Sequence, residues 1–367
     1  MDKNKRLTVW LPVIIAASIA LGIFIGNHYL SISQGKKRSY SSGNKINAIL
    51  DIIDEQYVDT VSMSKLVEST IPKIFSELDP HSVYIPAEDA SVVNEELEGS
   101  FSGIGVSFNM QTDTILVISV ISGGPAEKAG LLPFDRIISI NDSIFSGKKK
   151  NQGEIMKTLR GAKNSTVKLG VQRGNSPELL YFDVTRGDVP VNSVDVSYEA
   201  AKGIGYIKVS KFARNTYNEF ITAIAKLKQA GCTSFVIDLR GNTGGYMDAA
   251  INMINEFMPE GRLIVYTEGK SFPRSDVYAN GTGTCKDAPI VVLTDEISAS
   301  ASEIFSGAIQ DNDRGTIIGR RTYGKGLVQT QMSLSDGSEM RLTIARYYTP
   351  SGRCIQKKYE MGNTDAY

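Results

Sequence analysis

Apolar residues follow three different spacings along the chain, and each spacing predicts a different kind of structure. In residues 45–97 they recur every three or four positions, as in KINAILDIIDEQYVD, which predicts a small helical unit. Residues 98–188 contain short apolar runs separated by glycines, such as TILVISVI and VKLGVQR, which are typical of a compact β-rich domain. Strand and helix signals alternate over residues 189–367 and predict a layered α/β core, so the chain is expected to be an α/β multidomain protein.

The N-terminus has a continuous apolar run instead. LTVWLPVIIAASIALGIFIG, residues 7–26, carries no charge and follows the basic residues Lys3, Lys5 and Arg6. A segment of this length can span a bilayer. A cleavable signal peptide is the alternative, but the apolar core is long and no A-x-A site closes it, so we predict an uncleaved signal anchor over residues 1–26. Residues 27–44 then form a polar linker, and the bulk of the chain is expected to be exported to the periplasm or its equivalent, held at the inner membrane.

Composition narrows the function classes. The chain has 40 basic and 40 acidic residues and no basic stripe, so a nucleic-acid partner is not expected. Its three cysteines are scattered and no C-x-x-C or H-E-x-x-H motif occurs. We therefore expect no metal site and no cofactor.

The β-rich segment contains two stretches that resemble a PDZ domain. GSFSGIGVSF stands where that family has its glycine-rich carboxylate-binding loop, and ISGGPAEKAGLLPFDRIISIND resembles its middle stretch. Backbone N–H groups of Ile104, Gly105 and Val106, after Gly103, can form a nest for a carboxylate beside an open strand edge. Proteins or peptides with free C-termini are then the expected ligands. The alternative is that Gly103 and Gly105 only make a tight turn.

The stretch TDEISASASEIFSG, residues 294–307, carries the candidate nucleophile. Ala301, Phe305 and Ala308 follow helical spacing, so a helix begins among the serines, directly after the predicted strand APIVVLTDE. At such a junction free N–H groups and the helix dipole favour developing negative charge, as acyl transfer requires. The alternative is that these serines serve as a helix cap and as packing residues.

A nucleophilic serine needs a base, and the chain has two histidines. His28 belongs to the linker and His81 follows the turn-forming pair Asp79-Pro80, which disfavours a Ser-His-Asp triad. Lys325, between two glycines in YGKGLVQ, is the remaining base. It would need a pKa lowered by burial or by nearby positive charge. The alternative is a solvent-facing or phosphate-facing loop lysine.

Several motifs in a fixed order resemble those of the carboxy-terminal processing proteases, also called tail-specific proteases. They are LDPHSVYI, the PDZ-like segment, VIDLRGNTGG, SASASEIFSGAIQD, YGKGLVQ and YYTPSGRCIQ, and they cover residues 45–357. The resemblance implies Ser300 as nucleophile, Lys325 as general base and Gln329 as the residue that holds the lysine. It also implies an oxyanion hole made by the N–H groups of Ala301, Gly244 and Gly245, and a crotonase-like protease core.

Two further residues match the family motif. Glu303 and Asp311 are interpreted as structural, each in a buried salt bridge. The chain departs from the family at Thr243, where proline is usual, and it ends at Tyr367, where many relatives continue.

The leading hypothesis is therefore an exported, membrane-anchored serine endopeptidase with a Ser-Lys dyad, whose PDZ domain captures protein C-terminal tails. A PDZ adaptor that binds tails without cutting them is the alternative. A thiol enzyme using Cys232 or Cys354 is disfavoured because no histidine partner is evident. The apolar faces of the N-terminal helices leave homo-oligomerisation open.

Overall fold

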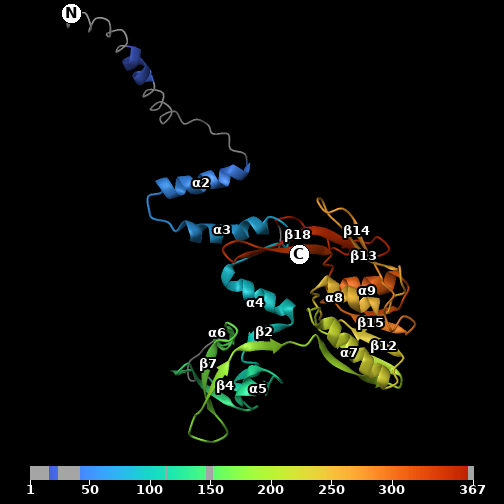
Figure 1. The fold of residues 1–367 in the computed structure, drawn as a ribbon. Coiled ribbons are helices and arrows are strands. Elements are labelled where there is room, and N and C mark those ends of the chain that lie inside the picture. The colour runs from blue at the N-terminus through green and yellow to red at the C-terminus, as the bar shows by residue number, and fades with distance from the viewer. Residues whose placement is uncertain (1–15, 24–41, 112–113, 146–151, 363–367) are drawn as a thin grey trace, which may run out of the picture. The chain divides into compact units, whose positions relative to one another are not determined.

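The computed structural model describes residues 16–23, 42–111, 114–145 and 152–362 (Figure 1). The chain divides into two compact units, Met1–Thr70 and Ile71–Tyr367. The helical unit predicted for residues 45–97 therefore spans this division.

The first unit is helical where it is described. Residues 16–23 form a helix, α2 covers Ser42–Gln56, and α3 covers Met63–Ser76 and continues past the division between the units. Most of the predicted anchor and linker lies outside the described residues. None of the described helices combines the length and the apolar character that crossing a bilayer requires.

The second unit holds the remaining elements. Its helices after α3 are α4 Ala87–Glu98, α5 Pro125–Ala129, α6 Gln152–Leu159, α7 Thr216–Gln229, α8 Met247–Asn255 and α9 Ala301–Asp311. Its first nine strands are β1 Val83–Ile85, β2 Ser100–Gly103, β3 Val106–Gln111, β4 Thr114–Val120, β5 Arg136–Ile140, β6 Ser143–Ile144, β7 Thr166–Gln172, β8 Leu180–Thr185 and β9 Gly187–Pro190. The later strands are β10 Val194–Ala201, β11 Ile204–Val209, β12 Ser234–Asp238, β13 Leu263–Glu268, β14 Ser275–Tyr278, β15 Ile290–Thr294, β16 Thr316–Gly319, β17 Leu327–Ser333 and β18 Glu339–Tyr348.

The β-rich domain predicted from the glycine-punctuated runs is present. Its main sheet has the order β3-β4-β5-β7-β8, with β6 on β5, and β2 pairs separately with β9. Alternate residues of these strands point into one apolar core, which also receives Ile155 and Leu159 of α6. In this order β3 is an edge strand, and among the described residues only β4 pairs with it.

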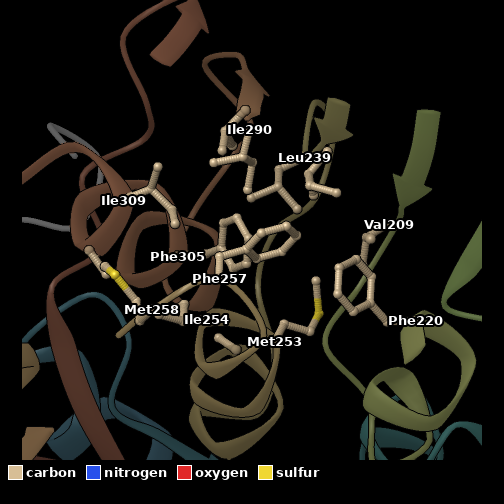
Figure 2. Packing of buried hydrophobic residues seen from close by; sticks show 14 of the residues in the cluster. Val209, Phe220, Leu239, Met253, Ile254, Phe257, Met258, Ile290, Phe305 and Ile309 are labelled. Carbon is tan, nitrogen blue, oxygen red and sulfur yellow. The ribbon is translucent and has the colours of Figure 1, made fainter. Parts of the chain in front are cut away.

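The α/β core is built on a second sheet with the order β10-β11-β12-β15-β16. The strands from β11 to β16 are parallel, and β10 is antiparallel to β11. One face is buried against α7, α8 and α9, where Phe257 makes edge-to-face contacts with Phe220, Phe235 and Phe305 (Figure 2). Burying one such ring contributes about 1.5–3 kcal/mol, so this face anchors the start of α9.

The segment NTYNEFITAIAKLKQAG predicts a helix that Asn215 caps and that ends at Gly231, and the start of α7 differs from this prediction. Asn215 precedes the helix as expected, but its backbone is already helical and its side chain makes no capping hydrogen bond. The Asn215 amide instead donates to Glu219, while the hydroxyl of Thr216 accepts the N–H of Ala213 at 2.7 Å. The prediction of an Asn215 side-chain cap was wrong, because the hydroxyl of Thr216 is the group that accepts a backbone N–H ahead of the helix. The predicted end at Gly231 is confirmed, since α7 ends at Gln229 and Gly231 adopts a φ of 93°.

A third sheet lies at the end of the chain. It has the order β1-β18-β13-β14, and β17 pairs with β18 along most of its length. Strand β1 comes from the predicted helical segment and pairs with β18, with Val83 opposite Arg341. This pairing brings the LDPHS stretch to the strands that follow Lys325.

Candidate active site

Ser300 stands at the junction predicted for a nucleophile. It follows β15 by a short turn and directly precedes α9. Its φ is 54° and its ψ is −112°, a backbone conformation that a residue with a side chain rarely adopts. Such strain persists only where the surroundings fix it, and it is concentrated at functional sites. The backbone therefore distinguishes Ser300 from the two neighbouring serines.

Those two serines hold the turn. The hydroxyl of Ser298 donates to the carbonyl of Leu239 at 2.8 Å, and that of Ser302 donates to the carbonyl of Asn242 at 3.0 Å. Asn242 also accepts the N–H of Ala299 at 3.0 Å. Both serine side chains are buried. They tie the start of α9 to the glycine-rich loop after β12, in agreement with their predicted packing role.

The three predicted oxyanion donors lie in one neighbourhood, but their N–H groups differ. A Cβ added to Gly244 would lie 2.8 Å from the Cβ of Ser300 and 3.1 Å from the nitrogen of Ala301. The N–H of Gly244 is already used, because it donates to the side chain of Asn242 at 2.8 Å. Within the described part of the chain, the N–H groups of Ala301 and Gly245 have no acceptor. Only these two of the predicted donors are therefore free for an oxyanion.

Gly244→Ala provides a test of this close approach. We expect it to lower kcat/KM by about a hundredfold or more, because the new methyl group would lie 2.7 Å from the carbonyl oxygen of Ala299 and 2.8 Å from the Cβ of Ser300, which displaces the proposed nucleophile. The matched control is Gly241→Ala in the same loop, where φ is also positive but no atom lies within 4 Å of the new Cβ. It should cost about 1–2 kcal/mol of stability and leave kcat/KM within about threefold. Equal activity losses in the two variants would contradict the assignment.

Glu303 connects the serine to the lysine. Its buried carboxylate accepts the N–H of Ser300 at 2.9 Å, of Gly324 at 2.7 Å and of Lys325 at 2.8 Å. Ser300 and Lys325 share the same oxygen, so their backbones lie within two hydrogen-bond lengths of each other. Burial raises the pKa of Glu303, although the hydrogen bonds oppose this. The predicted salt bridge is wrong for Glu303, which binds three backbone N–H groups instead.

The predicted salt bridge of Asp311 is present. Its carboxylate accepts from the guanidinium of Arg353 and from the hydroxyl of Ser351, which lies 2.5 Å away. Asp311 therefore fixes the end of α9 to the C-terminal segment.

Lys325 has the environment that a neutral amine requires. Its ammonium makes no hydrogen bond or ion pair with any described residue. Burial lowers its pKa, the positive charge of Arg341 lowers it further, and Asp79 and Glu303 act in the opposite direction. The hydroxyl of Tyr347 contacts the carbonyls of both Ser300 and Lys325, so it braces the two residues from a second side.

Gln329 lies in strand β17, and its contact differs from the expected one. Its amide donates to the backbone carbonyl of His81, and no hydrogen bond joins it to Lys325 among the described residues. His81 is nevertheless close enough for its charge to interact with that of Lys325. Burial and then Lys325 lower the pKa of His81 to about 4, against the opposing effect of Asp79. His81 is therefore neutral near pH 7.

The predicted carboxylate loop lies between β2 and β3. Ile104 is buried in the domain core, and Gly105 has a φ of 79°. Their carbonyls accept the N–H groups of Ala126 and Ile121, whereas their own N–H groups have no partner among the described residues. Val106 begins β3, the edge strand. Free N–H groups beside an open strand edge are the elements of a peptide-binding groove.

The candidate thiols find no support. Cys232 is buried, and burial raises the pKa of its thiol, which disfavours a reactive thiolate. Cys354 is exposed. No group of three or more metal-ligating side chains occurs in the described ranges.

Comparison with known proteins identifies both parts of the chain. Residues 203–363 match the family model of peptidase family S41, and residues 102–195 match that of the PDZ domain. A probable CtpA-like serine protease of Staphylococcus aureus is 33% identical over 365 residues, which are 97% of this chain and 72% of that protein. The chain belongs to peptidase family S41.

Other proteins resemble the S41 chain as well. The carboxy-terminal processing protease CtpB of Bacillus subtilis is 35% identical over 318 residues, covering 86% of this chain and 66% of that protein. The solved structure of a photosystem II D1 C-terminal processing protease has 28% identity and a TM-score of 0.48, and the match covers 86% of this chain and 91% of that one. The S41 chain thus spans about two thirds of the length of the B. subtilis relative.

Sequence reasoning about the S41 chain missed three contributors to the site. Asp79 had a usable signal, because an aspartate three residues before a serine often closes a turn with it. The spacing Ser300-x-x-Glu303 is that of a capping box and was a signal for the bond from the Ser300 N–H to Glu303. The bridging role of Tyr347 and the bonds of Glu303 to Gly324 and Lys325 had no signal, since they depend on contacts across the fold. Thr243 is exposed within its turn, so the absence of the usual proline leaves the adjacent glycines in place.

Proposed function

We propose that the chain is a serine endopeptidase that binds protein C-terminal tails through its PDZ domain and cuts peptide bonds with Ser300 and Lys325. The observation that carries the proposal is the shared carboxylate of Glu303. It joins the backbone of a strained serine to that of a lysine whose amine has no partner among the described residues. A serine beside an unprotonated amine is the minimum that nucleophilic acyl transfer requires.

The first step forms the acyl-enzyme. The neutral amine of Lys325 takes the proton of the Ser300 hydroxyl as its oxygen attacks the scissile carbonyl carbon. The carbonyl oxygen becomes an oxyanion and accepts the free N–H groups of Ala301 and Gly245. Gly244 serves by allowing the close approach of its backbone, because its own N–H is already bonded. The lysine then gives its proton to the leaving amine, which breaks the peptide bond and leaves an ester on Ser300.

The second step releases the product. Lys325, neutral again, takes a proton from water, and the hydroxide oxygen attacks the ester carbon. Collapse of the second oxyanion returns the proton to Ser300 and frees the new C-terminus. The lowered pKa of Lys325 makes the neutral fraction of its amine larger than that of an exposed lysine at the same pH.

The PDZ domain supplies the substrate selectivity in this proposal. A substrate tail adds as a strand to the free edge of β3, and its terminal carboxylate accepts the N–H groups of Ile104 and Gly105. Gly103 provides the turn before them, and Val106 begins the strand that receives the tail. Free protein C-termini are the ligand class that this arrangement fits.

The test compares an unstructured protein that has an apolar C-terminus with the same protein carrying a C-terminal amide. We expect the amide to lower kcat/KM at least about tenfold, mainly through KM, because it removes the charge that the N–H groups bind. Turnover near saturation should change little. Binding of both tails without any cleavage would favour the adaptor instead, and equal cleavage of the two proteins would reject tail recognition.

We further propose that the N-terminal apolar segment anchors the protein at the membrane with residues 45–367 exported. The support is the uncharged run of residues 7–26 after three basic residues. Protease digestion of intact cells with a permeable outer layer tests this, since exported domains are degraded and cytoplasmic ones are protected.

A further inference from the structure

A buried carboxylate that the mechanism does not use lies next to the proposed base. Asp79 is 8% exposed. Its Oδ1 atom accepts the N–H groups of His81 and Ser82 and the hydroxyl of Thr343, each at 3.0 Å. Its Oδ2 atom accepts the hydroxyl of Ser82 at 2.5 Å. Burial favours the protonated form, but these hydrogen bonds outweigh it and lower the pKa of Asp79, so the group is a carboxylate.

The turn that Asp79 closes is fixed to the strands after Lys325. The hydroxyl of Ser82 accepts the N–H of Thr343 at 3.0 Å, and the carbonyl of His81 accepts the amide of Gln329. The turn then continues into β1, which pairs with β18. These bonds join residues more than 240 positions apart, so the Asp79–Ser82 turn is one wall of the lysine site.

Three charged side chains, each from a different part of the fold, act electrostatically on the Lys325 amine. Arg341 of β18 adds positive charge, and its guanidinium is held by the side chain of Gln331 at 3.1 Å. Glu303 of α9 and Asp79 of the turn add negative charge. His81 of the same turn is neutral near pH 7. Asp79 is thus one of two carboxylates that balance a buried ammonium, and Glu303 is already bound to three backbone N–H groups.

We propose that Asp79 is a positioning residue for the base, holding the wall that carries Gln329 and setting the charge balance of Lys325. This inference rests on the proposed role of Lys325. The two contributions of Asp79 are separable, because three of its four hydrogen bonds go to Oδ1, an atom that asparagine keeps. Asp79→Asn removes the charge and the single hydrogen bond that Ser82 donates to Oδ2, whereas Asp79→Ala removes all four hydrogen bonds.

The decisive measurement is the pH dependence of kcat/KM for the full chain. The negative charge of Asp79 favours the protonated lysine, so Asp79→Asn should move the acidic limb of the profile to lower pH, by about one unit. Its limiting rate at alkaline pH should stay within about threefold of the wild type. Asp79→Ala should lose at least about tenfold at every pH, because the N–H groups of His81 and Ser82 lose their acceptor.

Asp336 offers a matched control. Its carboxylate closes a similar turn by accepting the N–H of Ser338 at 3.0 Å and its hydroxyl at 2.6 Å, but it is exposed and does not contribute to the charge at Lys325. Asp336→Asn should leave the acidic limb in place. A second readout is the pH dependence of the phosphonylation of Ser300 by a small phosphonate ester, in which the serine oxygen displaces the ester alcohol from phosphorus; this reaction needs no tail binding.

The possible outcomes are distinct. An unmoved acidic limb in Asp79→Asn would overturn the inference, and so would wild-type activity in Asp79→Ala. If one of these two results is found and Lys325→Met is inactive, the inference about Asp79 fails while the proposed function survives. If Lys325→Met keeps both its activity and its acidic limb, the proposed function itself fails.

Discussion

Ser300→Ala is expected to abolish peptide-bond cleavage, lowering kcat by about 10⁴-fold or more. Ser300 and Glu303 form a capping box at the start of α9, in which Glu303 accepts the backbone N–H of Ser300, so the substitution should also cost about 1 kcal/mol of stability. The loss of kcat should far exceed that effect, because the proposed nucleophile itself is removed. Cleavage of a tail-bearing protein measures it, and the affinity for the tail should stay the same.

Ser306→Ala is the matched control. Ser306 lies within α9 and is buried, and its hydroxyl donates to backbone carbonyls of the preceding turn, those of Ser302 at 2.9 Å and Glu303 at 3.5 Å. This variant should keep kcat within about threefold. If Ser300→Ala remained active while loss of another serine stopped the reaction, the assignment of the nucleophile would be wrong.

Lys325→Met should lower kcat/KM by about 10³-fold or more, because methionine preserves much of the apolar stem and removes the amine that we propose takes the serine proton. For the wild type, activity should fall as the pH is lowered, since protonation of Lys325 removes the base. The lowered pKa of Lys325 means that this limb lies below the pH at which an exposed lysine titrates.

Stability gives an independent check on the same lysine. The pKa of Lys325 is lower in the folded chain than in the unfolded chain, so its protonation opposes folding. This cost is largest below the folded pKa and disappears as the pH rises above the unfolded value. Lys325→Met should therefore melt at the same or a higher temperature near pH 7.

Lys357→Met is the control variant for this substitution. Lys357 is exposed and its backbone N–H donates to the carbonyl of Gly324 at 2.8 Å, so the variant should change neither activity nor stability appreciably. A loss of activity in that control would indicate a general effect of removing positive charge.

The elements that local patterns define were predictable. Buried strands such as β12 and β15 and the stripe of α9 follow directly from apolar spacing, and the structure contains them. The choice among the three serines was not a matter of spacing, because alternating alanine and serine give each hydroxyl the same local context. Only the family resemblance selected Ser300, and its positive φ is a property of the folded turn.

The contacts that could not be predicted join residues far apart in the sequence. Gln329 was expected to hold Lys325, yet its partner is the carbonyl of His81, 248 positions earlier. A buried carboxylate such as Glu303 suggests a cation as its partner. The spacing Ser300-x-x-Glu303 indicates one backbone N–H instead, but nothing in the sequence indicates the two from Gly324 and Lys325. Likewise β1 is three residues long, too short for any periodicity to register.

The shared carboxylate of Glu303 also limits how such an enzyme can be switched. The backbone N–H groups of Ser300 and Lys325 both donate to this carboxylate. A displacement of the loop of residues 324–326 would therefore either move the start of α9 as well or break these buried hydrogen bonds. The backbones of Ser300 and Lys325 therefore cannot separate without loss of these hydrogen bonds. An on–off control that leaves the core folded would have to act on parts with looser attachment, such as the glycine loop that faces the oxyanion or the path by which a tail arrives.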